Sequence, residues 1–182
     1  MRLFLALNIE AEVRRRCYDA TARLRAVRPD VRWVDETKLH LTIKFLGEQP
    51  EALLPKLTAA MDQAAAQSRA MDLLLGSIGA FPNFRQPRIV WIGVAPDPKL
   101  ELLHHDVEVA CDALGLGVDG RPFRPHVTLG RETSHGTADE RKALREAARL
   151  VRVREASPVA SVDLMQSAGG QYRVLHASPF GH

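Results

Sequence analysis

Two segments of the sequence each place a histidine and a threonine two residues apart. His40 and Thr42 lie in LHLTIKFLGE, and His126 and Thr128 lie in RPHVTLGRE. Side chains two positions apart on a β-strand project from the same face. Each segment is therefore expected to present an imidazole next to a hydroxyl group. One such face is compatible with an ordinary exposed strand, but its repetition in the second half of the chain indicates a shared site.

The chemistry that suits two histidines and two threonines is in-line displacement at phosphorus. The attacking oxygen must lose a proton on one side of the phosphorus, and the leaving oxygen must gain a proton on the other side. Histidine can be the base or the acid near neutral pH, because its unperturbed pKa is about 6.5. Threonine hydroxyls can donate to the non-bridging oxygens, where negative charge develops. The residues alone do not decide which histidine is the acid and which is the base.

Hydrophobic periodicity predicts the strands and helices that must position these side chains. Apolar alternation and β-branched residues predict a first strand within Met1–Glu10 and further strands over Val31–Val34, His40–Leu46, Met71–Ile78, Arg88–Val94, His126–Leu129, Val159–Met165 and Tyr172–Ala177. Helical spacing of apolar residues predicts helices over Ala11–Val27, Leu53–Ala66, Leu100–Leu114 and Ala138–Leu150. Similar units follow one another in the two halves, which indicates an internal duplication with one His-Thr strand in each half.

Strict alternation makes a specific prediction for the first His-Thr strand. Leu41, Ile43 and Phe45 are expected in the core. Lys44 is expected on the same face as His40, where it is either solvated or adds positive charge to the site. The two His-Thr faces can act on one phosphate only if the fold turns them toward each other across a groove.

Composition fits one globular domain, residues 1–182, with two similar halves. Of the 182 residues, 46% are hydrophobic and 26% are charged, which is ordinary for a chain that buries a core. The formal net charge of +3 and the many arginines favour anionic partners. No apolar run is long enough to span a membrane, and the start of the chain alternates like a strand rather than a signal peptide.

The two cysteines, Cys17 and Cys111, show neither metal-ligand nor disulfide-scaffold spacing, which favours a cytoplasmic protein. The HHDVE segment places His104 and Glu108 four residues apart on a predicted helix. Without further ligands this spacing is weak evidence for a metal, so neither a metal nor a cofactor is predicted.

The two His-Thr segments resemble the paired HxTx motifs of the 2H phosphoesterases. More narrowly, they are similar to those of the RNA 2′,3′-cyclic phosphodiesterases, also called 2′-5′ RNA ligases. RLFLALNI, GAFPNFRQPRIVWIGV and LMQS resemble the opening strand, the central loop and strand, and the penultimate strand of that family. The resemblance implies an α+β, bilobed fold, in which two antiparallel sheets are related by a pseudo-two-fold axis around a central groove, with the helices outside.

The resemblance also implies roles for individual residues. His40 would donate a proton to the leaving 3′ oxygen, and His126 would be the base that activates water, giving a 2′-phosphate without a metal. The reverse reaction, with a 5′-hydroxyl as nucleophile, would join RNA through a 2′-5′ linkage. Arg131 would contact phosphate or RNA. Strict alternation points Arg131 away from His126, so this role requires the strand to end or bulge near Gly130.

The predicted partner is RNA with a 2′,3′-cyclic phosphate terminus, and tRNA fragments are among the candidates. The protein is expected to be a monomer without an obligate protein partner. Thr42 and Thr128 are expected to bind the phosphate. Phe84, in the loop GAFPNFRQP, either stacks on a nucleobase or lies beneath its own loop. Two alternative functions stay open: an RNA-binding module without turnover, and a phosphodiesterase for a small cyclic phosphodiester.

Overall fold

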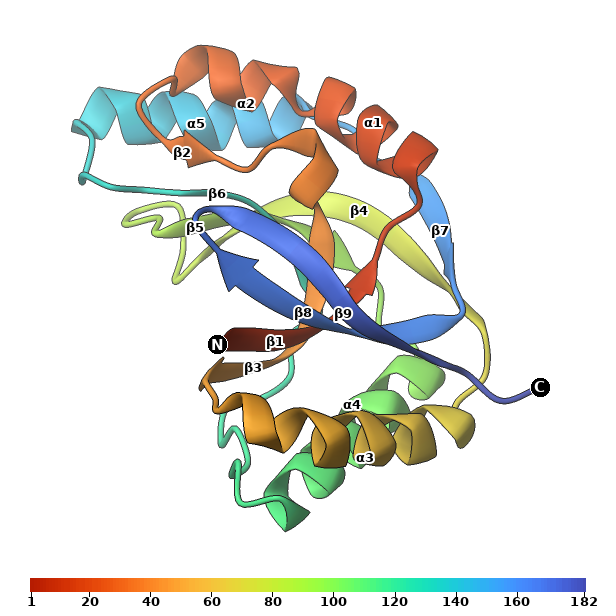
Figure 1. Cartoon of the computed structure of the whole chain (residues 1–182). Helices are drawn as coiled ribbons and strands as arrows, with labels where there is room; N and C mark the ends of the chain where they lie inside the picture. The colour runs from red at the N-terminus through yellow and green to blue at the C-terminus, as the bar shows by residue number, and fades with distance from the viewer.

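Nine strands form one antiparallel sheet in the computed structural model, which describes residues 1–182 (Figure 1). The strands are β1 (Arg2–Asn8), β2 (Arg32–Trp33), β3 (His40–Glu48), β4 (Met71–Phe81), β5 (Ile89–Val94), β6 (His126–Arg131), β7 (Glu155–Val159), β8 (Ser161–Ala168) and β9 (Gln171–Pro179). Their order in the sheet is β7-β4-β5-β6-β3-β1-β8-β9, and β2 also pairs with β6. Chain order and sheet order thus differ, and strands far apart in sequence lie side by side.

Five α-helices lie outside the sheet at its two ends (Figure 1). They are α1 (Ala11–Ala20), α2 (Ala22–Val27), α3 (Leu54–Ala66), α4 (Pro98–Ala113) and α5 (Ala138–Leu150), and two short 3₁₀ helices cover Glu36–Lys38 and Glu51–Leu53. Helix α2 packs on α5, and α3 packs on α4. None of these helices combines the length and the apolar character needed to cross a bilayer.

The sheet consists of two four-stranded halves that meet between β3 and β6. One half is β3-β1-β8-β9 and the other is β6-β5-β4-β7. They are joined through the pair Leu41–Val127. The predicted α+β fold with antiparallel strands and outer helices is confirmed, and the two expected sheets are the two halves of this continuous sheet. The two His-Thr strands are the strands at the junction.

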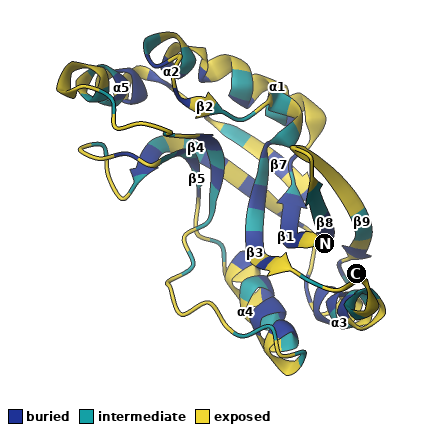
Figure 2. Ribbon diagram, turned by 60° about the vertical axis from the view of Figure 1, so that its left-hand side comes forward, coloured by how far each residue is buried: buried dark blue, intermediate teal, exposed yellow.

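Apolar residues from both halves fill one main core, a cluster of 35 buried residues. The strands β1, β5, β6 and β8 are mostly buried or half-buried, whereas the edge strand β9 and the outer faces of the helices are exposed (Figure 2). Strand β1 is buried on both faces, because Leu3, Leu5 and Leu7 enter the main core while Phe4 and Ala6 pack with Met165 on the opposite face. This second face is the one that carries His40, which lies against Phe4.

Two predicted elements are divided in the structure. The helix expected over Ala11–Val27 ends at Ala20 and resumes at Ala22. The hydroxyl group of Thr21 donates to the carbonyl of Cys17 at 2.9 Å, an alternative to regular helical bonding that threonine favours. The strand expected over Val159–Met165 corresponds to β8, but Val159 is the last residue of a separate strand, β7, which pairs with β4, whereas β8 pairs with β1. Strand β7 was not predicted, and its position at the edge of the sheet tolerates Pro158.

The prediction that Phe45 is buried and Lys44 lies beside His40 is wrong. Thr42 pairs with Ala6 and Lys44 pairs with Leu5, so Ile43 is an extra residue in β3. Such a bulge reverses the alternation of the side chains that follow it. Lys44 is consequently only 7% exposed, and Phe45 is 65% exposed. The Lys44 ammonium group donates to Glu108 Oε2 at 2.8 Å inside the protein.

Replacing Lys44 with Met is expected to lower the free energy of unfolding by about 3–5 kcal/mol, because the buried Glu108 carboxylate loses its countercharge. Urea denaturation of the variant measures this loss. The matched control is the double variant Lys44→Met/Glu108→Gln, which removes both charges and keeps an acceptor for the backbone N–H of Asp119. It is expected to recover most of the stability. A loss of under about 1 kcal/mol in the single variant, typical of a surface pair, would contradict the prediction.

Candidate active site

The junction between β3 and β6 brings the two His-Thr pairs together. Leu41 lies opposite Val127, and both side chains are fully buried in the core. The residues that flank this pair therefore face the other side of the sheet. Extending the antiparallel register by one residue on each side of this pair places His40 opposite Thr128 and Thr42 opposite His126. The two histidines are then diagonal neighbours, and Cα atoms in that relation are roughly 7–8 Å apart. A phosphate group between them would have an imidazole on each side.

Each imidazole is oriented by the same kind of hydrogen bond. Nδ1 of His40 lies 2.7 Å from the carbonyl oxygen of Lys38, and Nδ1 of His126 lies 2.6 Å from that of Arg124. A carbonyl oxygen only accepts, so Nδ1 carries the proton in both neutral rings. Nε2 is then free to accept a proton, and Nε2 of His40 accepts from the hydroxyl of Thr42 at 3.0 Å. Both rings are in the tautomer that a base acting through Nε2 requires.

The pKa of both histidines is lowered from the ordinary value of 6.5. Burial is the main cause, because it disfavours the charged imidazolium. The positive charge of Arg131 lowers both pKa values further, and His126 also lowers that of His40. Both rings are therefore neutral at pH 7 in the free protein. An anionic ligand between them acts in the opposite direction and raises both pKa values.

Aromatic side chains from distant strands pack against His40. Phe4 of β1 lies with its ring centroid 5.1 Å from that of His40, and Tyr172 of β9 lies edge-on at 5.4 Å. Phe4 and Tyr172 also contact each other, with 5.1 Å between their centroids. Phe4 is buried, which limits the access of water to one side of the imidazole.

His126 has a similar aromatic environment in the other half of the sheet. Phe81 of β4 lies edge-on to His126 at 4.9 Å, and Trp91 of β5 lies at 6.3 Å. Gly79 provides the space for Trp91, since a Cβ at Gly79 would approach the indole to 2.1 Å. No local pattern in the sequence predicts these aromatic contacts in either half, because they arise only from the pairing of distant strands.

Arg131 lies on the same face as the histidines because β6 contains a bulge. Trp91 pairs with Thr128 and Val90 pairs with Gly130, so Leu129 is an extra residue in β6. This is the irregularity near Gly130 that a role for Arg131 requires. The guanidinium is exposed and lies close enough to both histidines to lower their pKa values.

Phe84 is half-buried and packs against the main core. This placement agrees with the interpretation of an apolar side chain beneath its own loop. Stacking of Phe84 on a nucleobase stays a prediction. The aromatic residues that contact the histidines are others, Phe81 among them.

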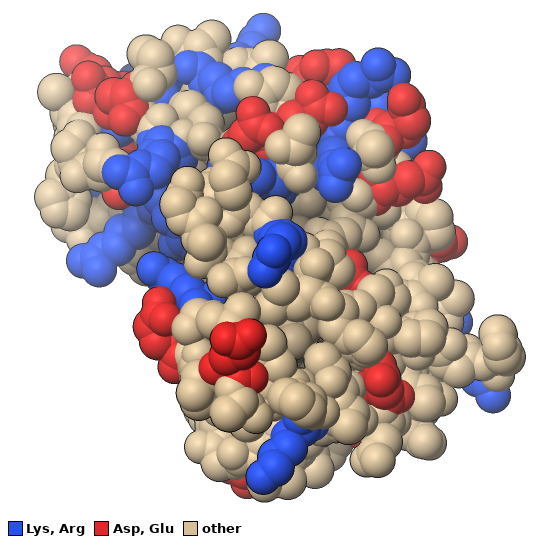
Figure 3. Space-filling model, viewed as in Figure 1, with Lys and Arg blue, Asp and Glu red and all other residues tan.

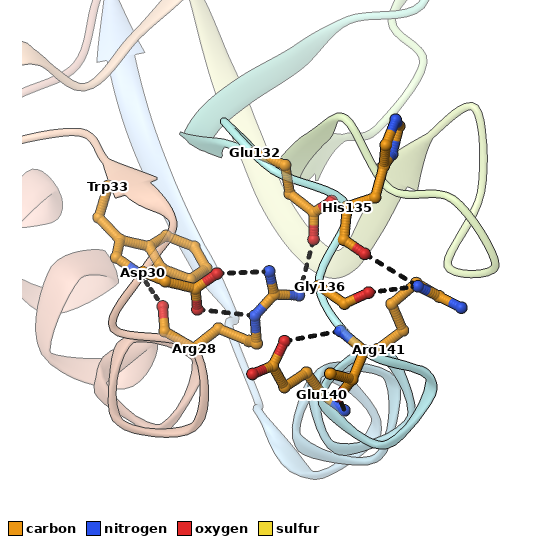
Figure 4. A network of polar contacts seen from close by, with 9 residues as sticks. Arg28, Asp30, Trp33, Glu132, His135, Gly136, Glu140 and Arg141 are labelled. Atoms are coloured by element: carbon orange, nitrogen blue, oxygen red, sulfur yellow. Dashed lines mark hydrogen bonds and ion pairs between the residues drawn. The ribbon is translucent and has the colours of Figure 1, made fainter.

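A buried arginine fixes the end of β6, next to Arg131 (Figure 4). The guanidinium of Arg28 binds Asp30 through two hydrogen bonds of 2.8 Å and Glu132 through one of 2.7 Å. Asp30, and after it Glu132, raise the pKa of Arg28. Trp33 Nε1 donates to the carbonyl of Arg28 at 2.7 Å. The helix predicted over Ala11–Val27 ends just before Arg28, and no local pattern predicts the contact of Arg28 with Glu132, which is 104 residues away.

His104 and Glu108 form no metal site in this arrangement. Glu108 is engaged by Lys44, and the His104 ring stacks on Phe123 with 4.0 Å between centroids. No group of three or more His, Cys, Asp or Glu side chains is placed to hold a metal ion. A surface cavity of about 320 Å³ lies near His126, lined by Leu74–Ser77 and Gly93–Pro96, and none of these residues is charged.

Known proteins share both the sequence pattern and this fold. The family model described as the 2′-5′ RNA ligase superfamily matches residues 11–171. The chain is 35% identical over 138 residues to the RNA 2′,3′-cyclic phosphodiesterase of Thermus thermophilus, covering 72% of this chain and 68% of the relative. It is 34% identical over 142 residues to the protein of that name from Geobacillus stearothermophilus, covering 78% of this chain and 45% of the relative. The match thus spans less than half of the length of the Geobacillus protein.

Solved structures resemble the chain over nearly its whole length. A crystal structure of a protein from Thermus thermophilus superposes with a TM-score of 0.80 at 27% identity, covering 99% of this chain and 98% of that one. E. coli LigT in complex with 3′-AMP superposes with a TM-score of 0.74 at 24% identity, covering 100% and 98%. The second similarity supports the fold alone.

Proposed function

The chain belongs to the 2′-5′ RNA ligase superfamily, and from this membership we propose that it hydrolyses RNA 2′,3′-cyclic phosphate ends to 2′-phosphates. The relatives named RNA 2′,3′-cyclic phosphodiesterase support the reaction. The observation that carries the proposal is the junction of β3 and β6, where two His-Thr pairs flank one position on the face of the sheet. We propose that His40 and His126 are the catalytic residues.

In the proposed mechanism, His126 Nε2 takes a proton from water, and the water oxygen attacks phosphorus. The bond from phosphorus to the 3′ oxygen breaks, and His40 Nε2 gives its proton to that oxygen. The tautomer of His126 in the free protein supports its role as the base, because Nδ1–H donates to the carbonyl of Arg124 and Nε2 is left unprotonated. His40 must gain a proton at Nε2 first, which the negative charge of the bound phosphate favours. Each proton transfer is expected to contribute about 10²–10⁴-fold to the rate.

Threonine and arginine side chains would bind the phosphate during this reaction. When His40 is protonated at Nε2, it no longer accepts from Thr42, so the Thr42 hydroxyl is released to donate to a non-bridging oxygen. Thr128 is in the matching position beside His40, and Arg131 supplies positive charge where the negative charge develops. The reverse reaction, with a 5′-hydroxyl of a second RNA as nucleophile, would form a 2′-5′ linkage.

We propose that the natural substrates are RNA fragments, cleaved tRNA among them, and that residues 1–182 form one domain that acts in the cytoplasm without an obligate protein partner. One main core supports the single domain. The two cysteines are free and buried rather than joined in a disulfide, which supports a reducing compartment.

Product analysis of a short RNA that ends in a 2′,3′-cyclic phosphate tests the proposal. The expected product is the 2′-phosphate, separated from the 3′-phosphate by chromatography against both standards. A 3′-phosphate would show that the 2′ oxygen leaves and would contradict the proposed reaction. Binding of the RNA without conversion would instead indicate an RNA-binding module. Adenosine 2′,3′-cyclic phosphate, assayed alongside, shows whether a small cyclic phosphodiester is a comparable substrate.

A further inference from the structure

Two arginines lie directly opposite each other at the end of the site. Strand β2 pairs with the end of β6, with Trp33 opposite Gly130 and Arg32 opposite Arg131. A Cβ at Gly130 would meet Trp33 and Val31, which places those two side chains on the core face of the sheet. Arg32, between them in sequence, therefore projects from the same face as Arg131.

No ion pair compensates this juxtaposition of like charges. Arg32 and Arg131 are both exposed, and neither takes part in an ion pair. Like charges directly opposite on neighbouring strands destabilise a sheet. The carboxylates nearest in sequence are Glu132, beside Arg131, and Asp30, two residues from Arg32, and both are bonded to Arg28. Figure 3 shows Lys and Arg side chains gathered beside the ends of β5 and β6.

The two arginines lie on different strands at this end of the site. Arg131 shares β6 with His126 and Thr128, whereas Arg32 is on the short strand β2, which pairs with β6 at Gly130 and Arg131. Arg32 is therefore one strand away from Arg131, at the end of β6 that lies beyond the His-Thr pairs. Arginine suits a phosphate there, because its planar fork binds two oxygens at once.

We propose that Arg32 binds the phosphodiester on the 5′ side of the terminal nucleotide. This inference rests on the proposed function, since it assumes that the cyclic phosphate lies between the histidines. Arg131 then contacts the cyclic phosphate and Arg32 contacts the next phosphate of the chain. The protein therefore selects an oligonucleotide end over a cyclic mononucleotide, and the RNA strand runs from the histidines along β6 toward β2.

Comparing kcat/KM for a cyclic-phosphate dinucleotide and a cyclic-phosphate mononucleotide tests this subsite. Arg32→Gln is expected to lower kcat/KM for the dinucleotide about tenfold or more, the loss of one charge-assisted contact. The same variant leaves the mononucleotide within about twofold of the wild type, because that substrate has no second phosphate for Arg32 to bind. The slope of log kcat/KM against log salt concentration for the dinucleotide should also decrease by about 0.7.

Arg23→Gln is the matched control, since Arg23 is an exposed arginine on the outer helix α2 without an ion pair. It should change neither substrate. Equal losses for both substrates with Arg32→Gln, or no loss for the dinucleotide, would overturn the subsite. The subsite would also be overturned if Arg124→Gln, and not Arg32→Gln, lowered kcat/KM for the dinucleotide alone. Arg124 lies at the opposite end of β6.

Equilibrium binding of the dinucleotide 2′-phosphate separates this subsite from the catalytic proposal. If the protein hydrolysed neither substrate but bound the dinucleotide about tenfold more weakly after Arg32→Gln, the enzyme would be ruled out and the subsite retained. Hydrolysis of both substrates with dinucleotide binding unaffected by Arg32→Gln would rule out the subsite and retain the enzyme.

Discussion

Replacing His126 with Ala is expected to lower kcat on an RNA 2′,3′-cyclic phosphate by about 10²–10⁴-fold, the typical contribution of a positioned general base. Water would then have to attack phosphorus without losing its proton to Nε2. The fold should survive, because His126 is half-buried and its one hydrogen bond, to the carbonyl of Arg124, lies at the surface. An unchanged unfolding midpoint is the control. Activity within about tenfold of the wild type would contradict the role of His126.

The pH dependence gives the same variant a second readout. In the wild type, activity falls with decreasing pH as His126 becomes protonated, and it falls with increasing pH as His40 loses its proton. Both pKa values lie below 6.5 in the free protein, so the optimum of kcat/KM is expected below pH 6.5. Bound phosphate raises both values, so the optimum of kcat lies at higher pH. His126→Ala should abolish the decrease on the acidic side of the profile.

Replacing His40 with Ala is expected to have a similarly large effect on RNA, about 10²–10⁴-fold in kcat, but through the leaving group. The 3′ oxygen of a ribose is a poor leaving group without a proton. p-Nitrophenolate leaves near neutral pH without one. The loss of kcat in His40→Ala, relative to the wild type, should therefore be much smaller on a nucleoside p-nitrophenyl phosphodiester. The nucleoside should have no hydroxyl group next to the phosphodiester.

The two histidine variants serve as controls for each other on the aryl substrate. His126→Ala should stay slow there, because the attacking water still needs a base. If His126→Ala were rescued by the aryl leaving group and His40→Ala were not, the acid and base roles would be exchanged. If the aryl substrate rescued both variants equally, or rescued neither, the assignment of separate acid and base roles to the two histidines would be contradicted.

Local sequence determined the secondary-structure elements and the strand face on which each His-Thr pair lies. The two-residue spacing of His40–Thr42 and His126–Thr128 places each pair on one strand face. Apolar periodicity predicted most of the strands and helices and the α+β class, and the flanks of the two motifs pointed to the family. These features follow from backbone geometry that repeats every two or 3.6 residues, so they can be read without knowing what each strand pairs with.

The tertiary structure decided everything that depends on the register between distant strands. Bulges at Ile43 and Leu129 reverse the alternation, and they turn Lys44 into the core and Arg131 toward the histidines. The aromatic contacts of both histidines and the opposition of Arg32 and Arg131 likewise arise where separate segments meet. An extra residue in a strand is defined only by the partner that lacks one. Periodicity within a single segment therefore contains no record of it, and the shape of the site becomes visible only when the sheet is assembled.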